Sequence, residues 1–152
     1  MSYEGYLFDL DGTVYANGEV FPGVSRLFQS LRRKNIPFRF LTNTSTRSRG
    51  MIAETLVSMG VFVEESEIVN SSLVAAQYLR EARFKSGHFL LQDGAMDDFK
   101  DFKRVKRKPD FLVVGDLGED WNHTKINEGF RSLMDGAHFV ALHHGRYCEG
   151  PD

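Results

Sequence analysis

The sequence predicts an α/β protein with a parallel sheet, and three observations support that prediction. Short apolar runs alternate along the chain with segments whose apolar residues recur at helical spacing. Two such helical segments separate the first three runs, as a parallel sheet with crossover helices requires. Polar residues follow directly after the first two runs, where the carboxyl ends of parallel strands would meet at one edge of the sheet.

The first part of the chain gives the clearest elements. Its first apolar run leads into a tight, oxygen-rich loop, and Phe21-Pro22-Gly23 then separates that loop from a helical pattern. Gly60 closes the second helical pattern. The expected elements are a strand over the apolar run that begins at Tyr6 and leads to Asp9, a helix from Val24 until Asn35, a strand at 38–41, a helix through Ile52, Leu56 and Met59, and a short strand region at 61–63 and 67–69.

A second alternating set begins at Ser71-Ser72, which we expect to cap a helix. The expected elements are a helix through Leu73, Ala76 and Leu79, strands at 89–91 and 111–114, a helix from Ile126 to Met134 that Gly136 ends, and a strand at 139–142. No internal repeat and no linker rich in glycine, serine or proline separates the two sets. We therefore predict a boundary near residue 70, with one part at 1–70 and the other at 71–152.

Composition limits the class of protein. The 152 residues are 41% hydrophobic and 12% aromatic, which is enough to build a core. Nineteen basic and 21 acidic side chains give a net charge of −2, so no overall field favours nucleic acid or an anionic membrane. The apolar runs are far shorter than the roughly 18 residues of a membrane span. With a single cysteine, Cys148, and no signal-peptide pattern at the N-terminus, we predict a cytoplasmic protein.

The loop after the first strand is the first candidate site. Asp9 and Asp11 stand one residue apart and are followed by Gly12 and Thr13. The plain alternative is an Asp-Gly turn whose carboxylates are solvated. The apolar lead-in and the hydroxyl at Thr13 favour a functional site instead. The run 42–46, Thr-Asn-Thr-Ser-Thr, stands at the end of the next strand and would supply the second half of that site.

Three other features favour plain interpretations. The basic run at 100–108 is typical of a solvated loop, with a phosphate-contacting surface as the alternative. His143 and His144 could bind metal, but adjacent histidines tend to point apart and no partner ligand stands at a recognisable spacing. We expect Cys148 to be a passive thiol, the default for a lone cysteine.

The motifs resemble those of a known family. The segment 6–15, YLFDLDGTVY, is similar to the first motif of the haloacid dehalogenase-like hydrolases, and Phe40-Leu41-Thr42-Asn43 looks like their second. The stretches 21–24, 36–43 and 46–48 resemble the subgroup with a large type-two cap, the NagD-like and HDHD-type phosphatases. Residues 123–147 look like the cap of that subgroup. The resemblance implies a Rossmann-like parallel-sheet core at 1–70, and an α/β cap at 71–152.

The resemblance also implies a chemistry. Asp9 would be the nucleophile that forms an aspartyl-phosphate, and Asp11 would be the general acid and base. Gly12 would permit a tight approach, while the Thr42 hydroxyl and the amides around Asn43 would hold the phosphoryl oxygens of a small phosphorylated substrate. Mg²⁺, a hard cation, would bind the Asp9 carboxylate and the Asp11 carbonyl.

The sequence departs from the family pattern in one respect. Cap-bearing members place a phosphate-binding lysine and a further acidic motif after the cap, so we expect this chain to stop inside the cap, with an incomplete core. An impaired phosphatase follows, or a fragment that only binds phosphate or dimerises. The first strand would then be an open edge that favours a homo-oligomer.

A capless phosphatase is the alternative. Lys108, the apolar run 111–114, Asp116 and Asp120 imitate the missing motifs. However, only six residues separate Lys108 from Gly115, where the family places a helix. The cap interpretation is therefore favoured.

Overall fold

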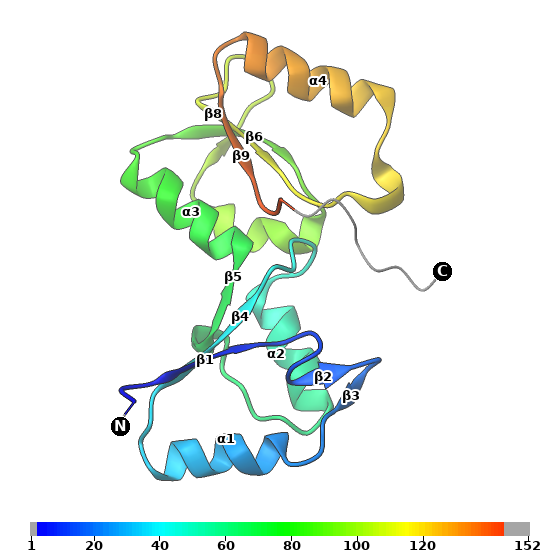
Figure 1. Cartoon of the computed structure of the whole chain (residues 1–152). Helices are drawn as coiled ribbons and strands as arrows, with labels where there is room; N and C mark the ends of the chain where they lie inside the picture. The colour runs from blue at the N-terminus through cyan, green and yellow to red at the C-terminus, as the bar shows by residue number, and fades with distance from the viewer. Residues whose placement is uncertain (1–2, 145–152) are drawn as a thin grey trace.

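The computed structural model describes residues 3–144 and contains two α/β halves joined where β5 leads into α3 (Figure 1). The first half has the strand order β1-β4-β5, with parallel pairing throughout. Its elements are β1 (Tyr6–Asp9), the hairpin β2 (Tyr15–Ala16) and β3 (Glu19–Val20), α1 (Val24–Arg33), β4 (Phe38–Thr42), α2 (Arg49–Ser58), a 3₁₀ turn at Glu65–Glu67, and β5 (Ile68–Asn70).

Alternation along β4 builds the core of the first half. Phe38 and Phe40 are buried, while Arg39 and Leu41 between them are exposed, as the two-residue period of a strand dictates. The Phe28 ring, on α1, packs edge-on against Phe40 at 4.9 Å between centroids. The helices α1 and α2 therefore cover this face of the sheet, and the strand at 38–41 is confirmed.

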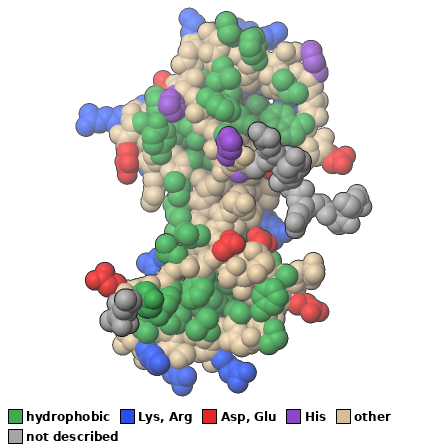
Figure 2. All heavy atoms as spheres, in the orientation of Figure 1, with side chains coloured by type: hydrophobic (Ala, Val, Ile, Leu, Met, Phe, Trp, Pro, Cys, Tyr) green, Lys and Arg blue, Asp and Glu red, His purple; other side chains and the backbone are tan. Residues whose placement is uncertain are grey.

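The other face of the same sheet is open among the described residues. Leu7 on β1 is 68% exposed and Leu41 on β4 is 37% exposed. β1 is also the edge of the sheet, since β4 is its only partner within 3–144. Hydrophobic side chains gather on the surface of the lower half in Figure 2, the part of the molecule to which Figure 1 assigns β1 and α1. The expectation of an open first strand is confirmed for this part of the chain.

The second half has the strand order β7-β6-β8-β9, again with parallel pairing. Its elements are α3 (Ser71–Glu81), β6 (Ser86–Leu90), a 3₁₀ segment at Asp93–Phe99, β7 (Lys103–Arg104), β8 (Phe111–Val114), a 3₁₀ turn at Gly118–Asp120, α4 (His123–Met134) and β9 (His138–Ala141). On β8, Phe111 and Val113 face a core that contains Leu79 from α3. Leu112 faces the opposite way, toward α4. Both faces of this sheet are thus covered.

Several predicted elements differ in detail. Residues 61–63 form no strand, and the expected strand at 67–69 lies at 68–70. The strand expected at 89–91 begins earlier, at Ser86. Asn70, rather than Ser71-Ser72, caps α3: its backbone is extended and its Oδ1 accepts from the Leu73 N–H at 2.9 Å. The junction of β5 and α3 falls at the predicted boundary, and the division into 1–70 and 71–152 stays a prediction.

None of the helices within 3–144 has the length and apolarity of a membrane span. Cys148 lies outside the described residues.

Candidate active site

The site forms where the strands of the first half end. Asp9 is the last residue of β1 and lies in register with Leu41, one residue before Thr42 at the end of β4. Thr42 lies in register with Asn70 at the end of β5. Because the three strands are parallel, these ends meet at a single edge, which is where open α/β sheets bind ligands.

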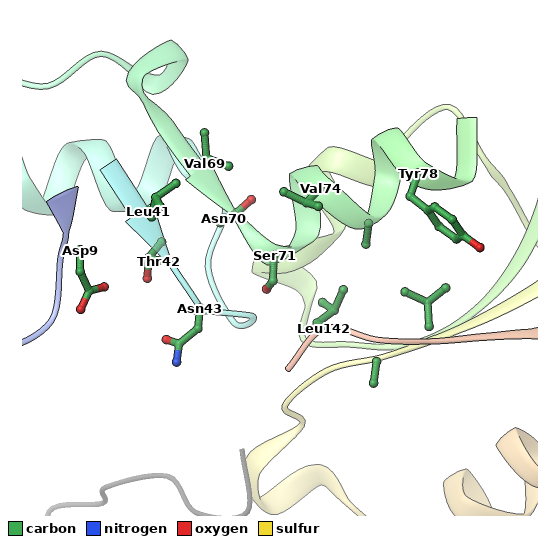
Figure 3. Close-up of a pocket in the computed structure, with 13 residues that line it drawn as sticks. Asp9, Leu41, Thr42, Asn43, Val69, Asn70, Ser71, Val74, Tyr78 and Leu142 are labelled. Atoms are coloured by element: carbon green, nitrogen blue, oxygen red, sulfur yellow. The ribbon is translucent and has the colours of Figure 1, made fainter. Parts of the chain in front are cut away.

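A cavity of about 620 Å³ opens at this edge between the two halves. The Asp9 carboxylate, the Thr42 hydroxyl and the Asn43 amide point to the same side of the sheet (Figure 3). The second half contributes mostly apolar walls, with Val74 and Tyr78 from α3 among them. The lining is completed by Leu41, Val69, Asn70, Ser71, Ala75, Val140, Ala141 and Leu142.

The loop after Asp9 is held by its own backbone. The Leu10 carbonyl accepts from the N–H groups of Thr13, Val14 and Tyr15, and the Gly12 N–H donates to the Tyr15 carbonyl at 2.8 Å. Gly12 has φ 75°, which a residue with a side chain rarely adopts. No protein atom lies within 4 Å of the place where its side chain would begin, so the backbone conformation of the loop is what requires glycine here.

Asp11 lies in a neighbouring pocket of about 300 Å³, which Tyr15, Arg47 and Thr42 also line. Burial, followed by the hydrogen bond to Asp11, raises the pKa of Tyr15 to about 12. Thr42 lines both spaces. The structure therefore brings Asp9, Thr42 and Asn43 together in one cavity, and places Asp11 in the adjoining pocket.

The Thr42 hydroxyl shapes the loop that follows β4. It is buried, donates to the Thr44 hydroxyl at 3.0 Å and accepts from the Thr44 N–H at 3.2 Å. A phosphoryl oxygen would compete with Thr44 for the Thr42 proton.

Oxygen atoms at the carboxyl end of β1 suit a hard cation. The Asp9 carboxylate lines the cavity, and the loop hydrogen bonds go to the carbonyls of Leu10 and Tyr15 rather than to that of Asp11. Mg²⁺ commonly uses one or two protein carboxylates and keeps several waters. The donor set therefore fits magnesium, although no group of three or more His, Cys, Asp or Glu side chains is gathered for a metal within 3–144.

The capless alternative is wrong in its topology. It requires Asp116 and Asp120 to complete the site at Asp9, but β8, which precedes them, pairs with β6 and β9 in the other sheet. Asp116 Oδ1 accepts from the Gly118 N–H at 2.7 Å, and Asp120 lines a separate pocket beside Lys125. The Lys108 N–H faces Asp135, at 3.4 Å from its Oδ2. These residues do not join Asp9 in the 620 Å³ cavity.

Sequence reasoning missed other residues that line these spaces. Asn70 ends β5 as Thr42 ends β4, so the rule about carboxyl ends of parallel strands could have found it. Tyr15 begins the hairpin β2–β3, whose Asn17-Gly18 turn has φ of 50° and 76°. That dipeptide is a hairpin signal readable in the sequence. Nothing in the sequence indicated that Tyr78 would line the same cavity as Asp9.

Comparison with known proteins supplies the remaining observations. The family model described as haloacid dehalogenase-like hydrolase matches residues 6–103. Haloacid dehalogenase-like hydrolase domain-containing protein 2 of Bos taurus is 33% identical over 146 residues, 96% of this chain and 55% of that protein. The acid sugar phosphatase of Staphylococcus saprophyticus is 28% identical over 92% of this chain and 55% of its own length. The chain thus spans about half the length of these curated relatives.

Two solved structures resemble this one over nearly the whole chain. The hypothetical protein PH1952 of Pyrococcus horikoshii OT3 superposes with a TM-score of 0.86 at 28% identity, covering 92% of this chain and 58% of the other. NagD from E. coli K-12 superposes with a TM-score of 0.87 over 97% of this chain and 60% of its own, and at 24% identity that likeness speaks for the fold. The expected α/β architecture with parallel sheets is confirmed.

Proposed function

Because the chain belongs to the haloacid dehalogenase-like hydrolases, we propose that it serves magnesium-dependent hydrolysis of small phosphate monoesters through an aspartyl-phosphate on Asp9. One observation carries this proposal. The Asp9 carboxylate stands at the carboxyl end of β1 and shares a cavity with the Thr42 hydroxyl and the Asn43 amide. A nucleophile and polar groups suited to phosphoryl oxygens therefore face the same space.

The reaction divides between the two acids. An Asp9 oxygen attacks phosphorus as the bond to the leaving oxygen breaks, and Asp11 donates a proton to that oxygen. Asp11 then takes a proton from water, whose oxygen attacks the phosphorus. The bond to Asp9 breaks and inorganic phosphate leaves. Thr42 and Asn43 would donate hydrogen bonds to the phosphoryl oxygens during both displacements.

Magnesium would be held by the Asp9 carboxylate and the Asp11 carbonyl. When bound, it would neutralise charge on the phosphoryl group, which with positioning is the main source of catalysis in this reaction class.

Relatives differ in the substrate that their names record. One is an acid sugar phosphatase, another a 5'-nucleotidase, and a solved neighbour is named a p-nitrophenyl phosphatase. We propose a small phosphorylated substrate for this protein, with residues 71–152 acting as the cap above it. A cytoplasmic location, a homo-oligomer, and no binding of nucleic acid or membrane complete the proposal.

A second candidate function, phosphate binding with little turnover, is favoured by the lining of the cavity. Within 3–144 that lining contains no lysine and a single carboxylate, Asp9. A lysine would offset the negative charges of nucleophile and phosphate, and further acids would complete a magnesium site. We therefore expect slow turnover by the 152-residue chain and detectable binding of inorganic phosphate.

The test uses p-nitrophenyl phosphate with magnesium. Asp9→Asn should abolish turnover and leave phosphate binding measurable, because the attacking oxygen is lost while the volume is kept. Asp120→Asn is the matched control and should leave turnover unchanged. Unchanged turnover in Asp9→Asn would remove Asp9 as nucleophile. Absence of both turnover and phosphate binding in the unaltered chain would reject both candidate functions.

A further inference from the structure

The loop from Asn43 to Ser48 connects the proposed phosphate-binding end of β4 to α2, and it packs against the second half at close range. A side chain at Gly94 would begin 2.6 Å from the Thr46 carbonyl oxygen and 3.5 Å from the Arg47 Cα. The first distance is shorter than real side chains show, and the atom it meets is backbone. Only glycine lets the segment after β6 lie this close to the loop.

A second contact comes from the segment after β8. Ser45 is buried, and its hydroxyl accepts from the Asp116 N–H at 3.2 Å. A side chain at Gly115 would begin 3.4 Å from the Ser45 Cβ. The Gly115-Asp116 pair, which imitates a catalytic motif in the sequence, therefore contacts this loop.

The third contact is an ion pair between the halves. Arg49, the first residue of α2, donates from Nε to Asp98 Oδ1 at 3.0 Å, and its Nη2 lies 3.3 Å from Glu65 Oε1. The Asp98 side chain is only 5% exposed. A carboxylate buried to this degree requires its partner, so the pair fixes the end of the loop opposite Thr42.

These contacts reach the phosphate site through the loop itself. The Thr42 hydroxyl is hydrogen-bonded to Thr44, and the Thr44 carbonyl accepts from the Ser71 hydroxyl at 3.5 Å. Hydrogen bonds with Ser71, Asp116 and Asp98 thus join the loop and the residue after it to the second half. Its shape is set from outside.

We infer that Gly94, Asp98 and the Asp116 backbone are positioning residues for the phosphate-binding loop, so that phosphate affinity at Thr42 and Asn43 depends on the second half. This inference rests on the proposed function, because it takes Thr42 and Asn43 as the phosphate ligands. It makes a part of the chain remote from Asp9 responsible for the geometry of the site.

The experiment titrates inorganic phosphate into the ¹⁵N-labelled full chain and follows the amide signals of residues 42–48. Asp98→Asn removes the charge of the buried pair at constant volume. Asp97→Asn is the matched control, since Asp97 is its neighbour, is exposed and, among residues 3–144, has Lys100 as its only ion-pair partner. Gly94→Ala tests the backbone contact independently. Amide hydrogen exchange of the loop is measured on the same samples.

Asp98→Asn and Gly94→Ala should weaken phosphate binding about fivefold or more, the lower range of coupling between sites. Both should speed exchange at 42–48 while β6 and β8 stay protected. Asp97→Asn should change neither quantity. Arg49→Lys keeps a cation opposite Asp98 and should retain most of the affinity that Arg49→Gln loses, which a general loss of stability would not reproduce.

Unchanged affinity and unchanged loop exchange in both Asp98→Asn and Gly94→Ala, in protein that remains folded, would overturn the inference. Weaker binding confined to variants that also lose protection in β6 and β8 would overturn it too, because the effect would then be global. If phosphate fails to shift the loop signals of the unaltered chain, the proposed phosphate ligands are wrong. Amide hydrogen exchange at 42–48 in the variants then tests separately whether Gly94 and Asp98 position the loop.

Discussion

The two halves of the molecule use the same parallel α/β architecture but bury it differently. The sheet β7-β6-β8-β9 has a core on each face, so that neighbouring residues of β8, Phe111 and Leu112, are both buried. The sheet β1-β4-β5 has a core on one face only, and Leu7 and Leu41 lie on the open one. Parallel sheets are ordinarily covered on both faces.

Because of this difference, we assign the chemistry of the site to the first half and most of the stability to the second. Asp9, Asp11, Thr42 and Asn43 belong to the half with the open sheet, whereas the second half lines the 620 Å³ cavity mostly with apolar side chains. The fully covered half supplies walls and supports the loop at 43–48. We therefore expect the second half to be the more stable one, and the first half to respond to ligands and to association.

A pair of matched substitutions should give the largest difference in stability between the two halves. Leu112→Lys places a charge beneath α4 and should unfold the second half, since burying an unpaired ammonium is prohibitive. Leu7→Lys places the same charge on the open face and should change the free energy of unfolding by less than about 0.5 kcal/mol. Circular dichroism with denaturant titration measures both. Equal loss in the two variants would contradict the comparison.

The same pair tests association. An open edge strand with an apolar face favours self-association, so gel filtration of the unaltered chain should give a species larger than a monomer. Leu7→Lys should shift the elution toward the monomer.

Large-to-small substitutions in the two cores should have the next largest effect on stability. Phe40→Ala and Phe111→Ala each remove a fully buried ring and should cost about 3–5 kcal/mol. Because the first half starts from a lower stability, Phe40→Ala should abolish amide protection in β1 and β4, whereas Phe111→Ala should leave weak but measurable protection in β6 and β8. Hydrogen exchange resolved by segment distinguishes the two. The reverse order would contradict the comparison.

Acid should weaken the second half selectively. His88 is buried with its Nδ1 2.8 Å from the Ser132 hydroxyl, and burial lowers its pKa. The unfolded chain therefore binds a proton first as the pH falls below about 6.5, so the stabilising effect of neutral His88 is complete above that pH and declines below it. Thermal unfolding between about pH 7.5 and about pH 5 should show this decline.

His88→Gln, which keeps a hydrogen-bonding group for Ser132, should flatten the decline, and His144→Gln, an exposed position, should leave it intact. An identical pH profile in all three proteins would exclude His88 as its cause.

Magnesium should give the smallest effect, and only in the first half. Two protein oxygens leave the ion mostly to water, so binding should be weak. At a concentration equal to the dissociation constant, the ligand stabilises the folded state by only about 0.4 kcal/mol. Exchange in β1 and the loop after it should slow slightly with magnesium. Asp9→Asn should remove that change, and slowing in β6 or β8 would point to a different metal site.

The sequence by itself determined most of the local elements and which residues of the candidate site lie together. The strand that leads to Asp9 and the strands at 38–41 and 111–114 could be predicted because apolar periodicity is local information. Asp9, Thr42 and Asn43 could be placed together because consecutive parallel strands end at one edge. The predicted start of β6 was too late, because Ser86, Gly87 and His88 look polar or flexible in the sequence. In the fold the Phe111 ring occupies the place of a side chain at Gly87, and Ser132 satisfies His88.

Only the tertiary structure decided which groups surround that site. Asp11 could not be assigned to a pocket separate from that of Asp9, because the direction of a loop side chain depends on the fold of its own loop and on Tyr15 and Arg47 beside it. The contacts of Gly94, Asp98 and Asp116 with the loop at 43–49 join residues about 50 to 70 positions apart, for which no periodicity exists. The resemblance predicted the open edge at β1, but which face of the first sheet is covered was a property of packing, since the alternation along β4 is the same whether or not its second face is covered.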